Sequence, residues 1–402
     1  MDATSRQAGA AGAVSGGPAP SAPALVQRIF YLDALRAFAM FYGILVHSAT
    51  IGMTGRGSRL FDIIIGSSDL FRMAAFFLIS GYFTAMACAR MEGAAYWRSR
   101  ADVLVVPLLS SLILLAPLTN WLVHRFHNGP VSLADYLFRG GWRAPTAGND
   151  VWHLHFWFLF SLIVFAAVTP PLAALVRSPR LAGPLGRLCE RHRTAVVWLA
   201  IVATGNAAML GTAAFMVILE PLLGSGPFAW IARATLAHAP FFVLGVLAHG
   251  SPPFFAALHR VSMPALLLFG SLFAWIGQAR DALPFALGGM LAAFAKAALV
   301  ASIVMALLAL FRHAVRAPSR IVSLGVNTSY TVYLFHLTAI YTLANLLLPL
   351  SADRLLLFAL IVPSATALLV LWHLKVIAPN PSLRFLFNGR RAAVSAPSPG
   401  RT

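Results

Sequence analysis

Long apolar runs recur along the whole chain, and they limit its possible folds more than any other feature. About ten of these runs approach the roughly 20 residues that a helix needs to cross a bilayer. They cover residues 35–53, 69–89, 103–123, 151–172, 195–219, 229–248, 263–279, 285–311, 323–349 and 355–377. Strands of membrane barrels are shorter and alternate apolar with polar residues, so these continuous runs indicate helices. We therefore predict an all-α fold, a polytopic membrane helix bundle of about ten transmembrane helices.

The composition agrees with a membrane protein. Of the 402 residues, 59% are hydrophobic and only 10% are charged, whereas soluble domains contain about 25% charged residues. The net charge of +18 would suit nucleic acid, but the arginines lie between apolar runs, where the positive-inside rule puts them. We therefore expect no nucleic-acid partner, and we expect the arginines to contact membrane lipids, including anionic ones.

Arginines gather in every second loop between the apolar runs. These loops hold Arg90, Arg98 and Arg100; Arg177, Arg180, Arg187, Arg191 and Arg193; Arg260; Arg312, Arg316 and Arg320; and Arg384, Arg390 and Arg391. With an even number of spans, these loops and both termini lie on one side of the membrane, which the positive-inside rule makes cytoplasmic. The opposite loops contain Arg56, Arg59, Arg125, Arg139 and Arg143, so the charge bias is incomplete.

The chain divides into three parts by composition. Residues 1–27 are rich in Ala, Gly, Ser and Pro and show no periodic apolar face, which indicates a disordered tail. This tail lacks the compact apolar core of a signal peptide, so we expect the first span to be retained. Residues 28–378 form one transmembrane domain, and residues 379–402 form a basic cytoplasmic tail.

Three polar side chains follow one another along the first span. Asp33 and Arg36 stand at its start, and His47 follows Arg36 eleven positions later. Eleven residues are about three helical turns and rise roughly 16 Å, so Arg36 and His47 share one stripe of the helix. If Arg36 lies at the inner headgroups, His47 lies near the middle of the bilayer, and Gly43 leaves room one turn before it.

An imidazole at that depth is costly unless it has a partner or a function. One interpretation is a histidine that bonds to a neighbouring helix. The other, which we favour, makes His47 a catalytic residue, because an acid, a guanidinium and an imidazole follow in order on the stripe. In that interpretation Asp33 pairs with Arg36 and sets its rotamer.

The second and third spans carry further polar residues. Arg72 lies near the predicted outer end of the second span, either as an interfacial side chain or in the lining of an outer cavity. Ser80 precedes Gly81 within that span, where small residues more often serve helix packing than catalysis. Arg98 and Arg100 stand at the inner mouth of the third span, where they either anchor the helix or bind phosphate groups.

Two more spans contain histidines. His153 and His155 are two positions apart, so they do not share a helix face, and no H-E-x-x-H pattern occurs. We therefore expect no metal site, although His155 can face the interior of the bundle. In the ninth span Ser329, Tyr333 and His336 lie close to one stripe. This stripe forms either interhelical hydrogen bonds or a second wall of a pocket.

The chain resembles the membrane acyltransferase 3 family over roughly residues 28–375. The family is marked by an arginine or lysine, ten residues and then a histidine in the first span, and Arg36 and His47 match that spacing. Further matches are YLDALR at 31–36, FFLISGYF at 76–83, the H-x-W-F-L pattern at 155–159 and SYTVYLFH at 329–336. The second-span motif and the start of the first span are most similar to the glucan-biosynthesis protein C branch. The family usually carries another basic residue near Val103, where this chain has none.

The resemblance implies an enzyme that transfers an acyl group from cytoplasmic acyl-CoA, as a cosubstrate and not a bound cofactor, to a glycan hydroxyl. It implies a bacterial inner membrane and, within the branch, a succinyl group placed on periplasmic glucans. Arg36, Arg98 and Arg100 would then hold the phosphates of the donor, and His47 would be the general base. Arg72, Ser80, His155, Ser329, Tyr333 and His336 would form the substrate pocket, with Tyr333 and Ser329 as candidate oxyanion donors.

The main alternative is a transporter or flippase for a lipid-linked sugar, because several buried histidines and arginines suit a polar pathway through a helix bundle. Such proteins commonly contain two related halves with broken helices, and no internal repeat is visible here. A receptor or purely structural membrane protein is a weaker alternative, because almost the whole chain is taken up by apolar runs.

Overall fold

The computed structural model describes residues 29–52, 59–141, 152–224, 226–317, 319–350 and 353–391. Within these ranges all regular elements are helices, so the all-α prediction is confirmed. The predicted disordered tail, Arg56, Arg143 and the chain after Arg391 lie outside the described residues.

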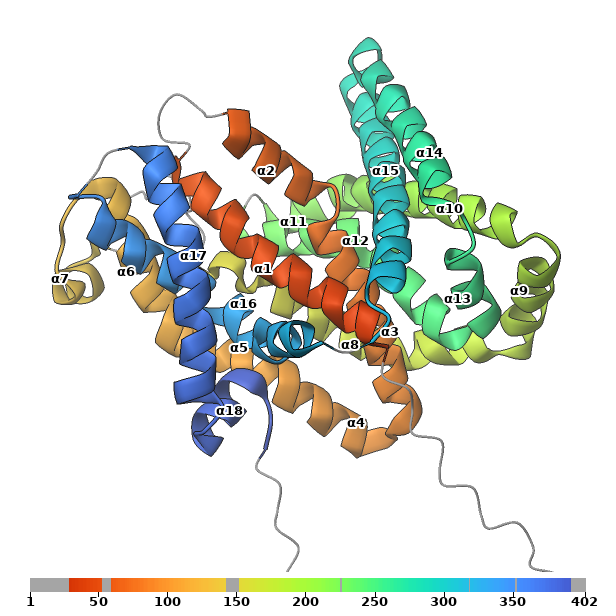
Figure 1. The fold of residues 1–402 in the computed structure, drawn as a ribbon. Coiled ribbons are helices and arrows are strands. Elements are labelled where there is room, and N and C mark those ends of the chain that lie inside the picture. Colours follow the sequence, from red (N-terminus) through yellow and green to blue (C-terminus); the bar gives the residue numbers. More distant parts are fainter. Residues whose placement is uncertain are drawn as a thin grey trace, which may run out of the picture.

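The α-helices follow one another in a single series (Figure 1). They are α1 (Phe30–Gly52), α2 (Arg59–Asp69), α3 (Arg72–Arg90), α4 (Gly93–Arg100), α5 (Val106–Ser110), α6 (Ala116–Asn128), α7 (Leu133–Phe138), α8 (Trp157–Arg177), α9 (Pro179–Arg191), α10 (Arg193–Ala214), α11 (Glu220–Leu223), α12 (Pro227–Gly250), α13 (Pro252–Leu258), α14 (Met263–Gly277), α15 (Phe285–Ala314), α16 (Arg320–Leu347), α17 (Arg354–Trp372) and α18 (Pro381–Asn388). Short π or 3-10 segments join several of them: η1 (Ala101–Val105), η2 (Ser111–Leu115), η4 (Leu154–Phe156), η5 (Phe215–Leu219), η6 (Gln278–Ala282) and η7 (His373–Ile377).

Each predicted span corresponds to helix, but the count of about ten is not confirmed. Among the described residues eight helical segments are long and apolar enough to cross a membrane, or nine if the pair Pro252–Leu258 and Met263–Ala282, bent by 84°, is one span. The helix α16 has 28 residues and is not among them, because its serines, threonines, asparagine and histidine lower its hydropathy. The second span begins at Arg59 instead of residue 69, since α2 and α3 together form one segment.

Helix α1 crosses the middle of the molecule in the view of Figure 1. It packs against α2, α3, α15, α16 and α17. Its buried residues include Leu32, Leu35, Ala39 and Ile44. This burial is expected for a helix with neighbours on several sides. This position surrounds the stripe of α1 with protein instead of lipid, so its polar residues can be satisfied without contact with hydrocarbon.

Helices α3 and α12 approach each other closely at two glycines. A Cβ added at Gly81 would collide with the main-chain carbonyl of Phe242, and one at Gly245 would collide with the carbonyl of Leu78. Lipid tails are as apolar as leucine, so close backbone approach is a main source of helix association in membranes. The FFLISGYF motif therefore serves packing at Gly81, and it fixes α3 beside α12.

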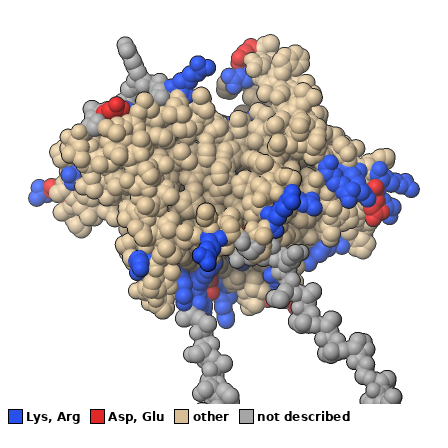
Figure 2. Space-filling view, viewed as in Figure 1, with Lys and Arg blue, Asp and Glu red and all other residues tan. Residues whose placement is uncertain are grey.

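The surface has the pattern of a lipid-facing protein. Large apolar side chains are widely exposed on it, among them Phe285 (95% exposed) and Trp275 (72% exposed). In the face shown in Figure 2, a broad uncharged area covers most of the molecule, and Lys and Arg lie along its lower edge and at one side, with fewer at its top. The start of α1, together with α4 and α18, lies toward that lower edge (Figure 1). The protein is a multi-pass membrane protein, because such an exposed apolar area is unfavourable in water.

The glycine contact between α3 and α12 gives a stability prediction. Gly81→Ala and Gly245→Ala should each lower the free energy of unfolding by about 1–3 kcal/mol, because the added methyl group meets a main-chain carbonyl that cannot rotate away. Thermal unfolding of the purified protein in detergent measures this effect. Gly289→Ala on α15 is the matched control, because a Cβ there meets nothing within 4 Å, and it should be neutral or stabilising. Equal melting temperatures for all three variants would contradict the proposed close approach.

Candidate functional site

A cavity of about 280 Å³ lies in the interior of the bundle, between α1, α3, α8, α12 and α16. Its apolar walls surround a small number of polar side chains, which is the usual character of a ligand site. The lining consists of Ala39, Met40, Gly43, His47, Arg72, Met73, Phe76, Leu154, His155, Trp157, Phe158, Trp230, Tyr333, His336 and Leu337. Five residues predicted for the site from the sequence are therefore brought together here: His47, Arg72, His155, Tyr333 and His336.

Three histidines from three separate elements meet in this cavity. The ring centroids of His47 on α1 and His336 on α16 are 5.0 Å apart, and those of His336 and His155 on η4 are 4.6 Å apart. These elements are far apart in the sequence, and the packing of α16 against α1 brings two of the rings together. The cluster can therefore bind and transfer protons over a short path.

The hydrogen bonds of His336 show which of its two ring nitrogens carries the proton. Its Nδ1 lies 2.7 Å from the carbonyl oxygen of Tyr333, and a carbonyl only accepts, so Nδ1 carries the hydrogen. In the neutral ring Nε2 is then an acceptor, and this buried atom has no partner among the described residues. An unpaired acceptor inside a membrane protein is costly, so Nε2 is available to a substrate.

His155 is held by an unusual turn of the backbone. Leu154, which precedes it in η4, has a φ of 49°, a conformation that is strained for a residue with a branched side chain. Both ring nitrogens of His155 are buried without a partner in the described chain, and the ring lies edge-on to Tyr333 with centroids 5.3 Å apart. The strain thus places an unbonded imidazole at the cavity wall.

Tyr333 supports the position of His155. Its hydroxyl donates to the main-chain carbonyl of His155 over 3.1 Å. This bond occupies the one proton of the hydroxyl, so Tyr333 would need to break it before it could donate to an oxyanion. In this geometry the Tyr333 hydroxyl holds the backbone of η4 in place, and with it this part of the cavity wall.

Arg72 reaches the cavity from the start of α3. It lies well inside the second membrane segment, since that segment begins at Arg59, and not at the outer end where we expected it. Its Nη1 comes within 2.9 Å of the position that a Cβ of Gly43 would take. The absence of a side chain at Gly43 therefore makes room for the guanidinium beside α1.

Arg36 and Asp33 form an ion pair away from the cavity, near the start of α1. The Arg36 Nη2 donates to Asp33 Oδ1 over 3.0 Å, and the side chains are 34% and 7% exposed, respectively. The guanidinium also lies over the ring of Phe83, 5.4 Å from its centroid. Helix α1 is continuous from Phe30 to Gly52, so the predicted rise of roughly 16 Å between Arg36 and His47 applies.

Ser80 and Ser329 do not line the cavity. Ser329 is buried and its hydroxyl donates to the carbonyl of Val326 in its own helix over 2.9 Å. Ser80 is partly buried on α3, next to the glycine that contacts α12. Both positions fit the packing interpretation of these serines better than a role in the pocket.

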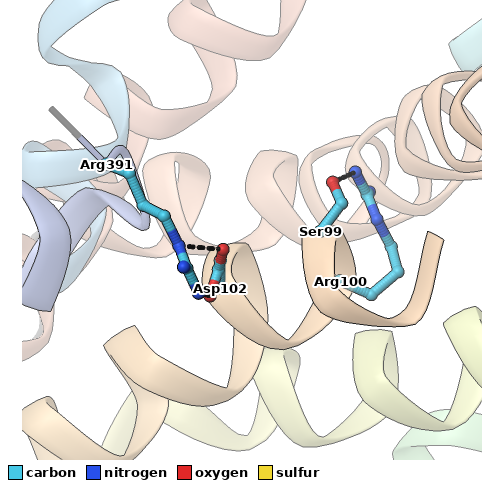
Figure 3. A network of polar contacts seen from close by, with 4 residues as sticks. All are labelled: Ser99, Arg100, Asp102 and Arg391. Atoms are coloured by element: carbon cyan, nitrogen blue, oxygen red, sulfur yellow. Dashed lines mark hydrogen bonds and ion pairs between the residues drawn. The ribbon is translucent and has the colours of Figure 1, made fainter. Parts of the chain in front are cut away.

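Arg98 and Arg100 end α4, at the entrance to the third span, and neither reaches the cavity. Arg98 is exposed. Arg100 is partly buried, and its guanidinium donates to the hydroxyl of Ser99 over 3.2 Å (Figure 3). These positions agree with either membrane anchoring or contact with an anion that approaches from that side.

The chain end supplies another arginine near this entrance. Arg391 forms two hydrogen bonds with the Asp102 carboxylate, of 2.7 and 2.8 Å (Figure 3). The hydrogen bonds and charge of Asp102 raise the pKa of Arg391 above its ordinary value. Gly389 makes this approach possible, because it has a φ of 63° and a Cβ there would collide with the carbonyl of Asp102. The entrance near Val103 therefore carries a basic residue from the far end of the chain.

The sequence interpretation missed part of the cavity wall. Phe76, Phe158 and Trp230 line it, but an aromatic residue in an apolar span gives no signal that separates a pocket from the core. Trp157, at the start of α8, also lines the cavity. Within the described part of the chain, no group of three or more His, Cys, Asp or Glu residues has a geometry that could hold a metal ion.

The fold and the cavity define a multi-pass helical membrane protein with a buried, histidine-rich site. A family model described as an acyltransferase domain matches residues 29–373, which is most of the chain. The protein therefore belongs to the acyltransferase 3 family.

Among curated proteins, glucans biosynthesis protein C of Escherichia coli strain K12 is 26% identical over 296 residues, which cover 66% of this chain and 73% of that protein. The protein of the same name from Escherichia coli O1:K1 is similar to the same extent. No solved structure matches the chain.

Proposed function

We propose that the protein transfers an acyl group from cytoplasmic acyl-CoA to a hydroxyl group of a periplasmic or lipid-linked glycan. The observation that carries this proposal is that His47 and His336 meet in one cavity, where Nε2 of His336 has no partner among the described residues. Helix α1 runs without a break from this cavity to Arg36. The family membership supports the acyl transfer. The names of the similar proteins support a glucan as the acceptor, and in the related branch the acyl group is expected to be succinyl.

His47 is the general base in this proposal. Its imidazole accepts the proton of the acceptor hydroxyl while the oxygen attacks the thioester carbon, which forms a tetrahedral intermediate. When the intermediate collapses, the C–S bond breaks and the imidazolium returns the proton to the leaving thiolate. A neutral imidazole has an acceptor nitrogen for the first step, and the imidazolium that it becomes has a proton to donate in the second. His336 and His155 lie beside His47 and can hydrogen-bond the acceptor or the intermediate.

The cavity is large enough only for the reacting parts of the donor and the acceptor. Its volume of about 280 Å³ is slightly below the roughly 300–1,000 Å³ of small-molecule sites. A short acyl chain and one hydroxyl of a sugar fit this space, whereas the nucleotide of CoA and the rest of a glycan must remain outside. This is the arrangement expected if donor and acceptor approach the site from opposite sides of the membrane.

Arg36, Arg98 and Arg100 bind the phosphates of the donor in this proposal. Arg36 lies about three helical turns from His47 along α1, and the pantetheine arm of CoA is long enough to span such a distance. The carboxylate of Asp33 holds the Arg36 side chain in place. In this proposal both termini lie in the cytoplasm and the protein lies in the bacterial inner membrane, and the Lys and Arg side chains at the lower edge of Figure 2 support this orientation.

The first test removes the proposed base. In purified protein with radiolabelled acyl-CoA and a glucan acceptor, His47→Ala should lower kcat by about 100- to 10,000-fold, the usual contribution of a general base. His313→Ala is the control, because His313 is exposed in the last turn of α15, and it should leave turnover unchanged. Normal turnover by His47→Ala would remove His47 from the mechanism. A purified wild type that moves the glycan across vesicles without acylating it would favour a transporter.

The second test concerns donor binding. Arg36→Ala should raise KM for acyl-CoA by about 10- to 100-fold, because a charge-assisted hydrogen bond to phosphate is worth about 1.5–3 kcal/mol. The KM for the glycan acceptor should change little. An unchanged KM for the donor, measured alongside a strongly lowered kcat, would assign Arg36 to the chemistry instead.

The third test uses the two nitrogens of His336. In His336→Gln the side-chain amide occupies the position of Nε2, whereas in His336→Asn it occupies the position of Nδ1, which only bonds to the backbone. If Nε2 meets the substrate, the glutamine variant should retain more activity than the asparagine variant at equal expression. The reverse order would assign His336 a purely structural role.

A further inference from the structure

The guanidinium of Arg72 has no carboxylate partner in its cavity. The residues that line the cavity include no Asp or Glu, and the buried Nε of Arg72 makes no hydrogen bond with the described chain. Asp69 is the nearest acid along the helix, but its side chain is 68% exposed and its Oδ2 lies 4.0 Å from Lys296 Nζ. A permanent positive charge inside a membrane protein is expensive without a counter-charge.

The surroundings of Arg72 hold the charge in place. Gly43 leaves open the space that Nη1 approaches, so α1 is shaped to admit the guanidinium. The guanidinium in this space forms a site for an anion that the described part of the chain does not supply.

We propose that Arg72 determines which acyl group is transferred, by pairing with a carboxylate at the far end of the acyl chain. This inference rests on the proposed function. A guanidinium and a carboxylate form two parallel hydrogen bonds, which fix both position and orientation. Arg72 lines the same cavity as His47, so a short chain can span from the carboxylate at Arg72 to a thioester carbon beside His47.

The other source of negative charge is the oxyanion of the tetrahedral intermediate. An oxyanion exists only during the reaction, and it would leave Arg72 unpaired in the complex with substrate. A carboxylate on the acyl group neutralises Arg72 as soon as the donor binds. The two roles also differ in a measurable way, because an oxyanion forms with every donor and a distal carboxylate is present on only some.

The experiment compares succinyl-CoA with butyryl-CoA, whose acyl chains have the same length and differ in the terminal carboxylate. With the purified full-length protein, kcat/KM for succinyl-CoA should exceed that for butyryl-CoA by about 100-fold, because a site built for a charged group leaves that group unpaired when the analogue lacks it. Arg72→Gln should reduce this ratio to within a few-fold of one, mainly by loss of succinyl transfer. Butyryl transfer should stay near its wild-type rate.

Two further variants keep the test decisive. Gly43→Ala retains the charge but displaces the guanidinium, so it should lower the ratio without removing Arg72, and it carries the test if Arg72→Gln does not reach the membrane. Arg125→Gln makes the same chemical change at an exposed arginine over Trp121, outside the cavity, and it should leave the ratio unchanged.

Three results would overturn the proposal. Equal losses for both donors in Arg72→Gln would assign Arg72 to the oxyanion. A wild type that uses both donors equally would show that no distal carboxylate is selected. A wild type that transfers nothing from succinyl-, butyryl- or acetyl-CoA would overturn the proposed function itself, and the role of Arg72 would fall with it.

Discussion

The structure depends on how it meets the free-energy cost of placing polar groups away from water. Histidines and an arginine occupy the interior of a bundle whose outer surface faces hydrocarbon, and they do so only because α1 is enclosed by neighbouring helices. The glycines between α3 and α12 bring the backbone close enough to keep α3 in this arrangement. Close packing at glycines therefore supports a site that consists of polar side chains.

Within the site, hydrogen bonds to main-chain carbonyls constrain two of the polar side chains, Tyr333 and His336. The carbonyl of Tyr333 sets the tautomer of His336, and the hydroxyl of Tyr333 holds the carbonyl of His155. Some atoms of His155, His336 and Arg72 have no partner in the described chain. These atoms are available to bind a substrate. A preorganised site of this kind loses little entropy when the substrate binds.

The sequence predicted the helical class and most helix positions, because apolar runs of span length have few alternatives. It also predicted five polar residues of the cavity, since an ionisable residue within such a run stands out. The number of spans was not confirmed, because α16 combines span length with too many polar residues to resemble a lipid-facing helix. The position of Trp157 in the cavity wall could not be predicted, since membrane interfaces and pocket walls both contain tryptophan and only packing distinguishes them.

The last described residue of the chain, Arg391, is bonded to Asp102 at the start of the third span. Helix α18 and the left-handed Gly389 bring it there. This entrance can reach its final form only after Arg391 has been synthesised, because 289 positions of the chain separate the two partners. Insertion of the early spans alone would therefore leave Asp102 without this partner, and the third span would gain it only when the last helices have been added to the bundle.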